Sequence, residues 1–325
     1  MRWKAGQGGH YEGWYCAFND PEGERGWWLR YSMRAPSDPA KAAECQLWFM
    51  RTDRSATPRN RAIRQTFPIS DLDHVAAPFQ LTVGPGKLHM GGCSGRVGDA
   101  AGEAAWDLKF DSLLPPLTPT PEWGARVATC YMEPHPRLRI TGTIEEDGRV
   151  TKVDGLLGEQ AHVFGARHST RWHWAECKHL GREGAAFVGV AAWPRIPGGA
   201  RSVTSLYLEL GDDRRLLRNT TLAMLKPRTE HSAAGWKFDA DYGLQRLAGE
   251  VVPRREDLIG ITYHDPSGAP VYCYHSELAD LSLRYYARKR KDFAWNLEEE
   301  ITAPSACAFE YGTVEKLDGV QLLLD

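Results

Sequence analysis

The chain has 325 residues, of which 42% are hydrophobic and 25% are charged. This composition is typical of a globular protein and excludes intrinsic disorder over most of the length. Forty Lys and Arg residues against 42 Asp and Glu residues give a formal net charge of -2, so no global positive field attracts a polyanion. Nucleic acid is therefore not expected as a partner. The length favours two domains, with one large all-β domain as the alternative.

The N-terminal segment and the cysteines indicate the compartment. Residues 1–10 contain no apolar stretch like that of a secretory signal, and no window approaches the roughly 18 apolar residues that a membrane span needs. Seven cysteines occur without a Cys-x-x-Cys pair, which favours buried thiols in a reducing compartment. We expect a cytoplasmic protein with no integral membrane span, no metal site and no cofactor.

Tryptophan is unusually frequent. The twelve tryptophans are roughly two to three times ordinary usage, and nine of them precede residue 180. Aromatic residues pack in the cores of β proteins, and they also line cavities for large apolar ligands. Composition alone favours packing.

The hydrophobic pattern has a period of two almost everywhere, which predicts strands. The clearest segments are Trp27–Tyr31, Glu44–Met50, Arg137–Ile144, Val203–Leu210 and Leu281–Tyr285. Residues 146–149 and 265–268 have the Asp, Pro and Gly residues of tight hairpin turns. Residues 280–290 also alternate, so we predict a hairpin with the basic residues 287–291 in its solvated turn. Many short strands joined by hairpins predict an all-β fold of antiparallel sheets or barrels.

Glu12 is the first residue along the chain that is a candidate for catalysis. If residues 10–16 form a strand, Glu12 lies on the same face as Trp14. Burial beside indole rings raises the pKa of a glutamate, so Glu12 is a candidate general acid of the kind that protonates an alkene. A structural ion pair with Arg30 or Arg34 is the alternative.

The densest group of titratable residues lies between residues 158 and 177. On a strand, Trp172, Trp174 and Glu176 face one way, and Arg171 faces the other. The carboxylate of Glu176 would then lie among indole rings.

Two common kinds of site are not expected in this segment. His162, His168 and His173 lack the His-x-His or His-x-x-x-His spacing that places ligands on one face of a strand or helix. Ser169 lacks the Gly-x-Ser-x-Gly turn of a hydrolase nucleophile.

The two segments together resemble the hydroxyneurosporene synthase and AttH-like family. That family includes carotenoid 1,2-hydratases and is related to tocopherol cyclases and to the lipocalin-like pericyclases of fungal polyketide pathways. The similar pieces, all before residue 180, are His10-Tyr-Glu-Gly-Trp-Tyr15, Trp28-Leu-Arg-Tyr31, Gln160-x-His162-x-aromatic-Gly165 and Arg171-Trp-His-Trp-Ala-Glu-Cys177. Phe164 stands where the family usually has Trp. The resemblance implies two tandem lipocalin-like antiparallel β-barrels, which we expect at residues 1–178 and 179–325.

The resemblance also implies a site with a few polar groups and many aromatic ones. Glu12, His162 and Glu176 are the expected catalytic acids or bases. The expected substrate-binding residues are Trp14, Tyr15, Trp28, Arg30, Gln160, Phe164, Arg171, Trp172 and Trp174.

By resemblance, the protein is a cofactor-free cyclase, isomerase or hydratase of secondary metabolism, acting on an apolar isoprenoid or polyketide-like polyene. Such an enzyme must protonate a double bond, hold the cation against π faces and control water. A non-catalytic carrier of a hydrophobic metabolite is the alternative. A carboxylate or imidazole deep among tryptophans favours catalysis, whereas purely aromatic and aliphatic walls favour the carrier. An interaction scaffold would instead show a large exposed aromatic patch and no cavity.

Overall fold

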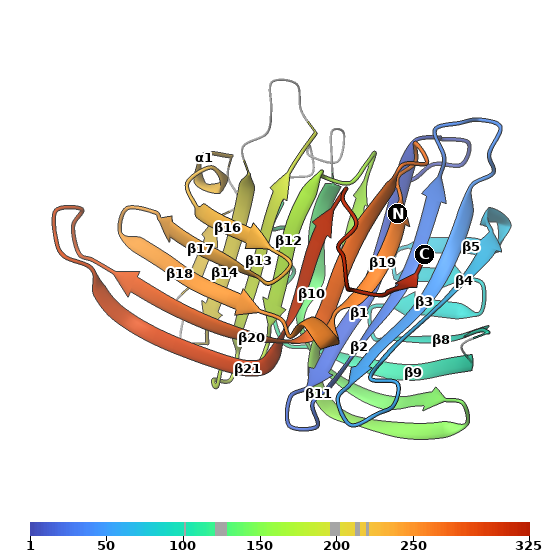
Figure 1. Cartoon of the computed structure of the whole chain (residues 1–325), viewed down its shortest axis with the longest axis horizontal. Helices are drawn as coiled ribbons and strands as arrows, with labels where there is room; N and C mark the ends of the chain where they lie inside the picture. Colours follow the sequence, from blue (N-terminus) through green and yellow to red (C-terminus); the bar gives the residue numbers. More distant parts are fainter. Residues whose placement is uncertain (101, 121–128, 196–201, 212–214, 219–220) are drawn as a thin grey trace.

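The structure is a computed structural model of the chain. It describes all residues except 101, 121–128, 196–201, 212–214 and 219–220. Two large sheets of mostly antiparallel strands lie side by side, one curved into a nearly closed barrel and the other into a half-barrel (Figure 1). The predicted all-β fold with two tandem lipocalin-like barrels is confirmed.

The first sheet contains eleven strands in the order β4-β3-β2-β1-β11-β10-β9-β8-β7-β6-β5. These strands are β1 (His10–Asp20), β2 (Arg25–Ala35), β3 (Glu44–Asp53), β4 (Asn60–Pro68), β5 (Leu72–Ala76), β6 (Phe79–Val83), β7 (Gly86–His89), β8 (Gly92–Asp99), β9 (Gly102–Ser112), β10 (Thr129–Glu146) and β11 (Arg149–Gly165).

The second sheet follows the order β15-β14-β13-β12-β21-β20-β18-β17-β16, and β19 and β22 extend it beside β20. Its strands are β12 (Arg171–Cys177), β13 (Ala185–Trp193), β14 (Val203–Leu210), β15 (Arg215–Arg218), β16 (Arg228–Ser232), β17 (Gly235–Asp241), β18 (Gln245–Val252), β19 (Ile259–His264), β20 (Pro270–Ala287), β21 (Asn296–Thr313) and β22 (Leu322–Leu324). Short helical turns are η1 (Ile69–Asp71), α1 (Thr221–Met224) and η3 (Arg255–Asp257).

The chain passes from the first sheet to the second between Gly165 and Arg171, since β11 pairs in one sheet and β12 in the other. The boundary at residue 178 stays a prediction.

Two hairpin turns lie where the sequence predicts them. Asp147 and Gly148 join β10 to β11 with φ of 50° and 80°, the left-handed conformation that a two-residue hairpin turn requires. The long hairpin of β20 and β21 turns through residues 288–295, where the basic residues 289–291 are exposed. The predicted solvated turn is confirmed.

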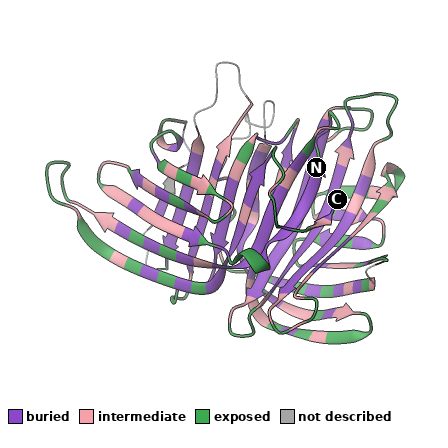
Figure 2. Cartoon of the chain, viewed as in Figure 1, coloured by how far each residue is buried: buried purple, intermediate pink, exposed green. Residues whose placement is uncertain are grey.

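Buried residues fill both faces of the strands where the two sheets meet (Figure 2). In β1, Trp14, Cys16 and Phe18 pack into the first barrel, while Tyr15 and Ala17 pack toward the second sheet. Successive side chains of a strand point to opposite faces, so a strand covered on both sides is buried at nearly every residue. Strands β1–β4 pack against β19–β22, and this contact positions the site described below.

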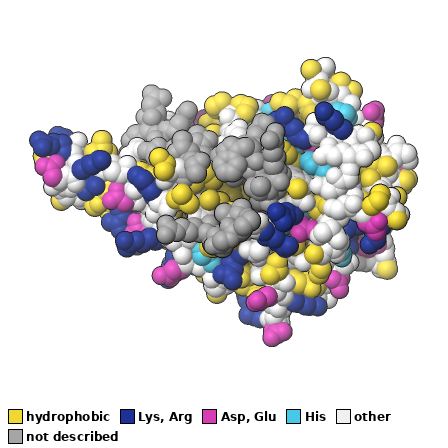
Figure 3. Space-filling view, turned by 90° about the horizontal axis from the view of Figure 1, so that it is seen from above, with side chains coloured by type: hydrophobic (Ala, Val, Ile, Leu, Met, Phe, Trp, Pro, Cys, Tyr) yellow, Lys and Arg dark blue, Asp and Glu magenta, His cyan; other side chains and the backbone are white. Residues whose placement is uncertain are grey.

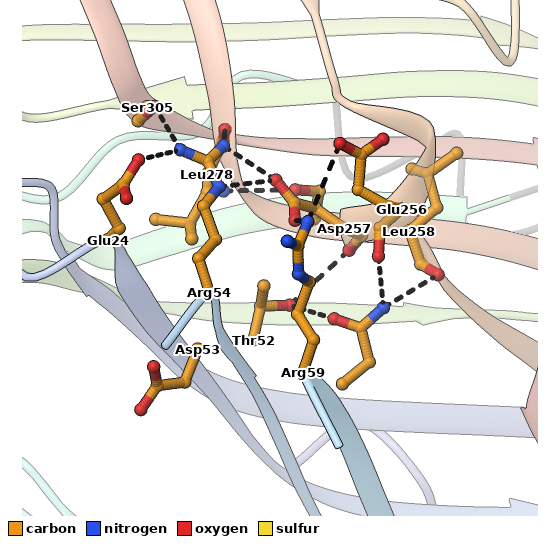
Figure 4. Close-up of polar contacts among 12 residues, drawn as sticks. Glu24, Thr52, Asp53, Arg54, Arg59, Glu256, Asp257, Leu258, Leu278 and Ser305 are labelled. Atoms are coloured by element: carbon orange, nitrogen blue, oxygen red, sulfur yellow. Dashed lines mark hydrogen bonds and ion pairs between the residues drawn. The ribbon is translucent and has the colours of Figure 1, made fainter. Parts of the chain in front are cut away.

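A cluster of hydrogen bonds and ion pairs connects the turn after β3 with η3 (Figure 4). The guanidinium of Arg54 donates hydrogen bonds to Asp257 at 2.9 and 2.7 Å and to Glu24 and Ser305 at 2.7 Å each. Arg59 donates to the same Asp257 at 3.1 Å. Because the Asp257 carboxylate is fully buried, its two arginines compensate the cost of removing it from water.

All seven cysteines lie in the described part of the chain, where they are buried and form no disulfide bond. Among the helices of the described residues, none is long and apolar enough to cross a membrane. The cytoplasmic location stays a prediction.

Candidate functional site between the two sheets

A cavity of about 210 Å³ opens between the outer face of β1–β4 and the strand β19. The register of β2 with β3 aligns Arg30 with Trp48 and Arg34 with Glu44, so alternate residues of both strands reach the cavity. Its charged residues are Arg30, Arg34, Arg64, Glu12 and Glu44, and its aromatic wall includes Tyr11, Trp48, His168 and Tyr263.

His168 is an oriented imidazole on the cavity wall. Its ring stacks on Tyr11 at a centroid distance of 4.2 Å and on Tyr263 at 5.2 Å. Its Nδ1 lies 2.7 Å from a carboxylate oxygen of Asp265, which also accepts the backbone N–H of His168. A carboxylate accepts hydrogen bonds, so it holds the proton on Nδ1 and leaves Nε2 available for proton exchange.

Asp265 is suited to this role because it stays ionised. Burial alone raises the pKa of Asp265, but hydrogen bonds from His168 and the charges of His168 and Arg195 outweigh burial and lower it. The Arg195 guanidinium lies 3.6 Å from the carboxylate.

Arg30 lies at the floor of the cavity among three aromatic rings. Its guanidinium carbon is 5.4 Å from the ring centre of Trp28, 5.8 Å from Trp48 and 5.0 Å from Tyr263, and Nη1 donates to the Tyr263 hydroxyl at 3.3 Å. A Cβ on Gly13 would lie 2.5 Å from Nη2 of Arg30. Glycine in β1 therefore makes room for the guanidinium.

Glu12 has the opposite protonation behaviour to the one expected from the sequence. Burial raises its pKa, but hydrogen bonds from His10 at 3.0 Å and His162 at 2.9 Å, with the backbone N–H of Trp3, lower it to about 2. The expectation of a raised pKa is wrong because these donors stabilise the charged form more than burial disfavours it. The partners are histidines and main-chain amides rather than Arg30 or Arg34.

The predicted site residues divide into separate groups. Five face the interior of the first barrel, since β1 and β11 pair Glu12 with Phe164, Trp14 with His162 and Cys16 with Gln160. Within this group the Trp14 and His162 rings stack at 4.7 Å. The group consists of Glu12, Trp14, Gln160, His162 and Phe164.

A second group lies between the two sheets. The predicted faces of residues 171–177 are confirmed: Trp172, Trp174 and Glu176 point toward the first sheet, whereas His173 packs on Trp236 inside the second barrel. This group consists of Tyr15, Trp28, Arg30, Trp172, Trp174 and Glu176. Arg171 is exposed at the second barrel, with its guanidinium carbon 5.9 Å from the ring centre of Trp193. Of all predicted site residues, two border the cavity: Arg30, and Glu12, although the side chain of Glu12 belongs to the group in the first barrel.

Glu176 belongs to a buried network of acids between the sheets. The Tyr131 hydroxyl donates to Glu133 at 2.6 Å and accepts from Nε1 of Trp174 at 2.9 Å. Lys178 forms an ion pair with Glu176 and lies 3.6 Å from Glu159.

Two carboxylates of this network retain their protons to a higher pH than an ordinary glutamate. Burial raises the pKa of Glu133 to about 7, against the opposing charge of Lys178. Burial, with the charge of Glu277, raises the pKa of Glu159 to about 8, again against Lys178. A single lysine does not offset several desolvated carboxylates.

The network approaches the cavity through His275. Its Nε2 lies 2.8 Å from Glu277 and its Nδ1 lies 3.3 Å from Glu310, and these carboxylates outweigh burial and raise the pKa of His275 to about 9. Glu310 also accepts from Nε1 of Trp172 at 3.1 Å, and Trp172 stacks on His168 at 5.8 Å. Packed polar and aromatic side chains thus connect the buried acids with the cavity wall.

Sequence reasoning missed most of the cavity wall. His168 lies in the segment that the sequence singles out, but its spacing from other residues indicates only a metal site, which the same spacing argues against. Tyr263 precedes the predicted turn at residues 265–268 and Asp265 begins it, and no local pattern relates either residue to His168. Among the described residues, no three His, Cys, Asp or Glu side chains come together in a way that could hold a metal ion.

Comparisons with known proteins define the class of fold. No family model matches the chain. A protein described as AttH-like from Nitrosomonas europaea has a similar structure, with a TM-score of 0.55 and 12% identity over 94% of this chain and 92% of that one. Kievitone hydratase from Nectria haematococca has a TM-score of 0.52 and 10% identity over 94% of this chain and 89% of that one. The chain therefore shares the tandem lipocalin-like fold of these proteins.

Sequence relatives extend over most of the chain. An uncharacterized protein of Mycobacterium tuberculosis, from the strains CDC 1551 / Oshkosh and ATCC 25618 / H37Rv, is 24% identical over 299 residues, or 88% of this chain and 84% of its own. Membership of the hydroxyneurosporene synthase family stays a prediction.

Proposed function

We propose that the protein is a cofactor-free isomerase, cyclase or hydratase that protonates a conjugated organic substrate in the cavity between its two sheets. The observation that carries this proposal is His168, an imidazole that lines the cavity and has Nδ1 bound to the ionised Asp265. Imidazole is the side chain best suited to donate and accept protons near neutral pH.

The proposed reaction begins with proton transfer from Nε2 of protonated His168 to one carbon of a substrate double bond. Positive charge then develops on the adjacent carbon, where the faces of Tyr11, Trp48 and Tyr263 stabilise it. Loss of a different proton to His168 completes an isomerisation. Attack by a second double bond followed by proton loss gives a cyclisation, and attack by water gives a hydration in which the proton of that water returns to His168.

In this proposal His168 takes the role that the sequence assigns to Glu12, His162 and Glu176. Glu12 contributes to the wall, but its carboxylate is held by His10 and His162. Glu176 is held in the network of Tyr131 and Lys178. Catalytic roles for these three residues stay predictions.

The volume of the cavity limits how much of a substrate it can enclose. Its volume of about 210 Å³ is below the roughly 300–1,000 Å³ of pockets that enclose drug-sized ligands. We therefore propose that one end of an isoprenoid or polyketide-like substrate enters the cavity while the remainder extends outside. The imidazole and guanidinium groups on the wall favour catalysis over the carrier alternative.

The test is solvent deuterium incorporation. Wild-type protein is incubated in D2O with a panel of conjugated polyenes and aryl alkenes, and the products are analysed by mass spectrometry. We expect at least one compound to gain deuterium, or deuterium together with the oxygen of water. His168→Asn, which retains a donor for Asp265 and removes Nε2, should lower this rate by roughly 100-fold or more.

His74→Asn is the matched control, because His74 is exposed on β5, away from the cavity. It should leave the rate unchanged. Compounds that bind the wild type but never gain deuterium would favour the carrier, and an unchanged rate in His168→Asn would contradict the proposed acid.

A further inference from the structure

The cavity wall carries more positive than negative charge. Arg34 is paired with Glu44 at 2.9 Å. Arg64 donates to the backbone oxygens of Thr262 and Asp325, at 3.4 and 2.7 Å. No carboxylate oxygen pairs with Arg30 within the part of the chain that the structure describes, although only 6% of this residue is exposed.

The hydrogen bonds of Arg30 are incomplete for a buried guanidinium, although the buried carboxylate of Glu310 interacts with its charge from a distance. Its hydrogen bond goes to the neutral hydroxyl of Tyr263, and its Nε has no partner. A buried cation is costly unless an anion or several acceptors compensate it. A ligand that brings an anionic group to Arg30 would supply this compensation.

Two neighbouring groups also respond to positive charge. Burial lowers the pKa of His264, and the charges of Arg34 and Arg64 lower it further. Burial lowers the pKa of Arg64, and Arg34 adds to the shift while Glu44 opposes it. Both groups line the same cavity as Arg30, and burial is the main cause of both shifts, while the carboxylates of Glu44 and Asp325 oppose the arginine charges at each group.

The aromatic wall selects a flat ligand. The rings of Tyr11, His168 and Tyr263 are nearly parallel, with angles of 15° and 6° between the imidazole and its two neighbours. Because these rings stack on one another, a conjugated ligand would contact their edges and the rings of Trp48 and Tyr263, which also line the cavity. The molecule seen from above shows basic and histidine side chains among hydrophobic ones on the face that the grey atoms leave visible (Figure 3).

We propose that the cavity binds a planar conjugated organic carboxylate, with its carboxylate on Arg30 and its conjugated part against Trp48 and Tyr263. This inference refines the substrate class of the proposed function and rests on it for the claim that the ligand is also converted. The volume of about 210 Å³ suits one ring with a short unsaturated chain better than a long polyene. Arginine recognises a carboxylate through two parallel hydrogen bonds, which gives geometric selectivity as well as affinity.

The experiment is a binding titration followed by fluorine NMR. The probes are 4-fluorocinnamate and its neutral counterpart 4-fluorocinnamyl alcohol, with 6-carbon hexanoate as a competitor that has the charge but no ring. We expect the carboxylate to bind at least tenfold more tightly than the alcohol and hexanoate to compete weakly. Equal affinities for acid and alcohol would overturn the proposal.

Substitutions at the cavity test where the carboxylate of the ligand binds. Arg30→Gln should weaken 4-fluorocinnamate binding at least tenfold and leave the affinity for the alcohol within about twofold. Because Arg30 is buried and its loss can impair folding, Arg64→Gln on the half-buried rim and Gly13→Ala, which displaces the guanidinium and keeps its charge, provide independent tests. Each should weaken the acid at least threefold.

Arg96→Gln is the control, because this arginine forms an exposed pair with Glu103 on the first sheet. It should bind both probes like the wild type. Unchanged acid binding in all three cavity variants would overturn the proposal. If the protein binds the carboxylate but no compound gains deuterium, this inference stands and the proposed function is contradicted. If neutral polyenes are converted but the carboxylate does not bind, the proposed function stands and this inference is contradicted.

Discussion

The interior of the first barrel and the space between the two sheets both bury glutamates, but they hold them in opposite states. Inside the first barrel, His10, His162 and a main-chain N–H donate to Glu12 and lower its pKa to about 2. Between the sheets, burial raises the pKa of Glu159 to about 8, although Lys178 lies nearby. The first carboxylate is ionised at neutral pH, and the second retains its proton.

This difference shows that the number of donors for each carboxylate decides its state, since both residues are buried. Glu12 has several donors to itself. Glu159 shares one lysine with Glu133 and Glu176. Acids that retain protons are therefore found between the sheets, where Glu310 and Trp172 connect their network with the cavity wall.

The acids between the sheets stay buried only while the contact between the sheets is closed, and Arg54→Ala tests how strongly the Asp257 cluster holds it. The variant leaves the fully buried Asp257 with Arg59 as its remaining arginine partner. Breaking one partner of a buried ion pair costs about 3–5 kcal/mol. Urea denaturation should show a loss of this size in the free energy of unfolding. Arg96→Ala, which breaks an exposed pair, should change it by less than about 1 kcal/mol; similar losses in both variants would contradict a specific role for the Asp257 cluster.

Glu159→Gln tests whether the carboxyl of Glu159 retains its proton between the sheets. A carboxyl whose pKa is raised in the folded state opposes folding as the pH rises, because the unfolded chain releases the proton first. With a folded pKa of about 8 and an ordinary value of 4.5, this penalty grows between pH 4.5 and 8 and reaches up to about 4 kcal/mol. The variant should therefore be more stable than the wild type at pH 8 and similar at pH 4. Denaturation curves at both pH values measure this change, and destabilisation at pH 8 would contradict a protonated Glu159.

Glu12→Gln should give the opposite sign. A carboxylate whose pKa is lowered in the folded state stabilises the protein above its ordinary pKa, and this contribution is lost as the pH falls from 4.5 toward 2. The shift to about 2 corresponds to about 3 kcal/mol at neutral pH. The variant should lose this amount at pH 7 and converge with the wild type near pH 2, as followed by thermal unfolding. A constant difference across this range would indicate a packing effect instead.

Much of the fold follows from the sequence because strand periodicity and turn residues act locally. Alternation places Glu12 and Trp14 on one face and Tyr15 on the other, as found. Local patterns of this kind could not predict which residues meet at the cavity. Arg30 and Tyr263 are separated by 233 residues and meet only because the second sheet covers the outer face of β1–β4. The state of Glu12 depended likewise on its histidine donors, one of which comes from β11.

The central claim is that a ligand binds between the sheets rather than inside either barrel. Three histidines mark the three regions: His162 in the first barrel, His168 at the cavity and His173 in the second barrel. Nitrogen NMR of protein with labelled imidazole rings, titrated with 4-fluorocinnamate, measures all three at once. We expect the ring signals of His168 to shift while those of His162 and His173 stay in place. Shifts at His162 or His173 with His168 unchanged would contradict the claim.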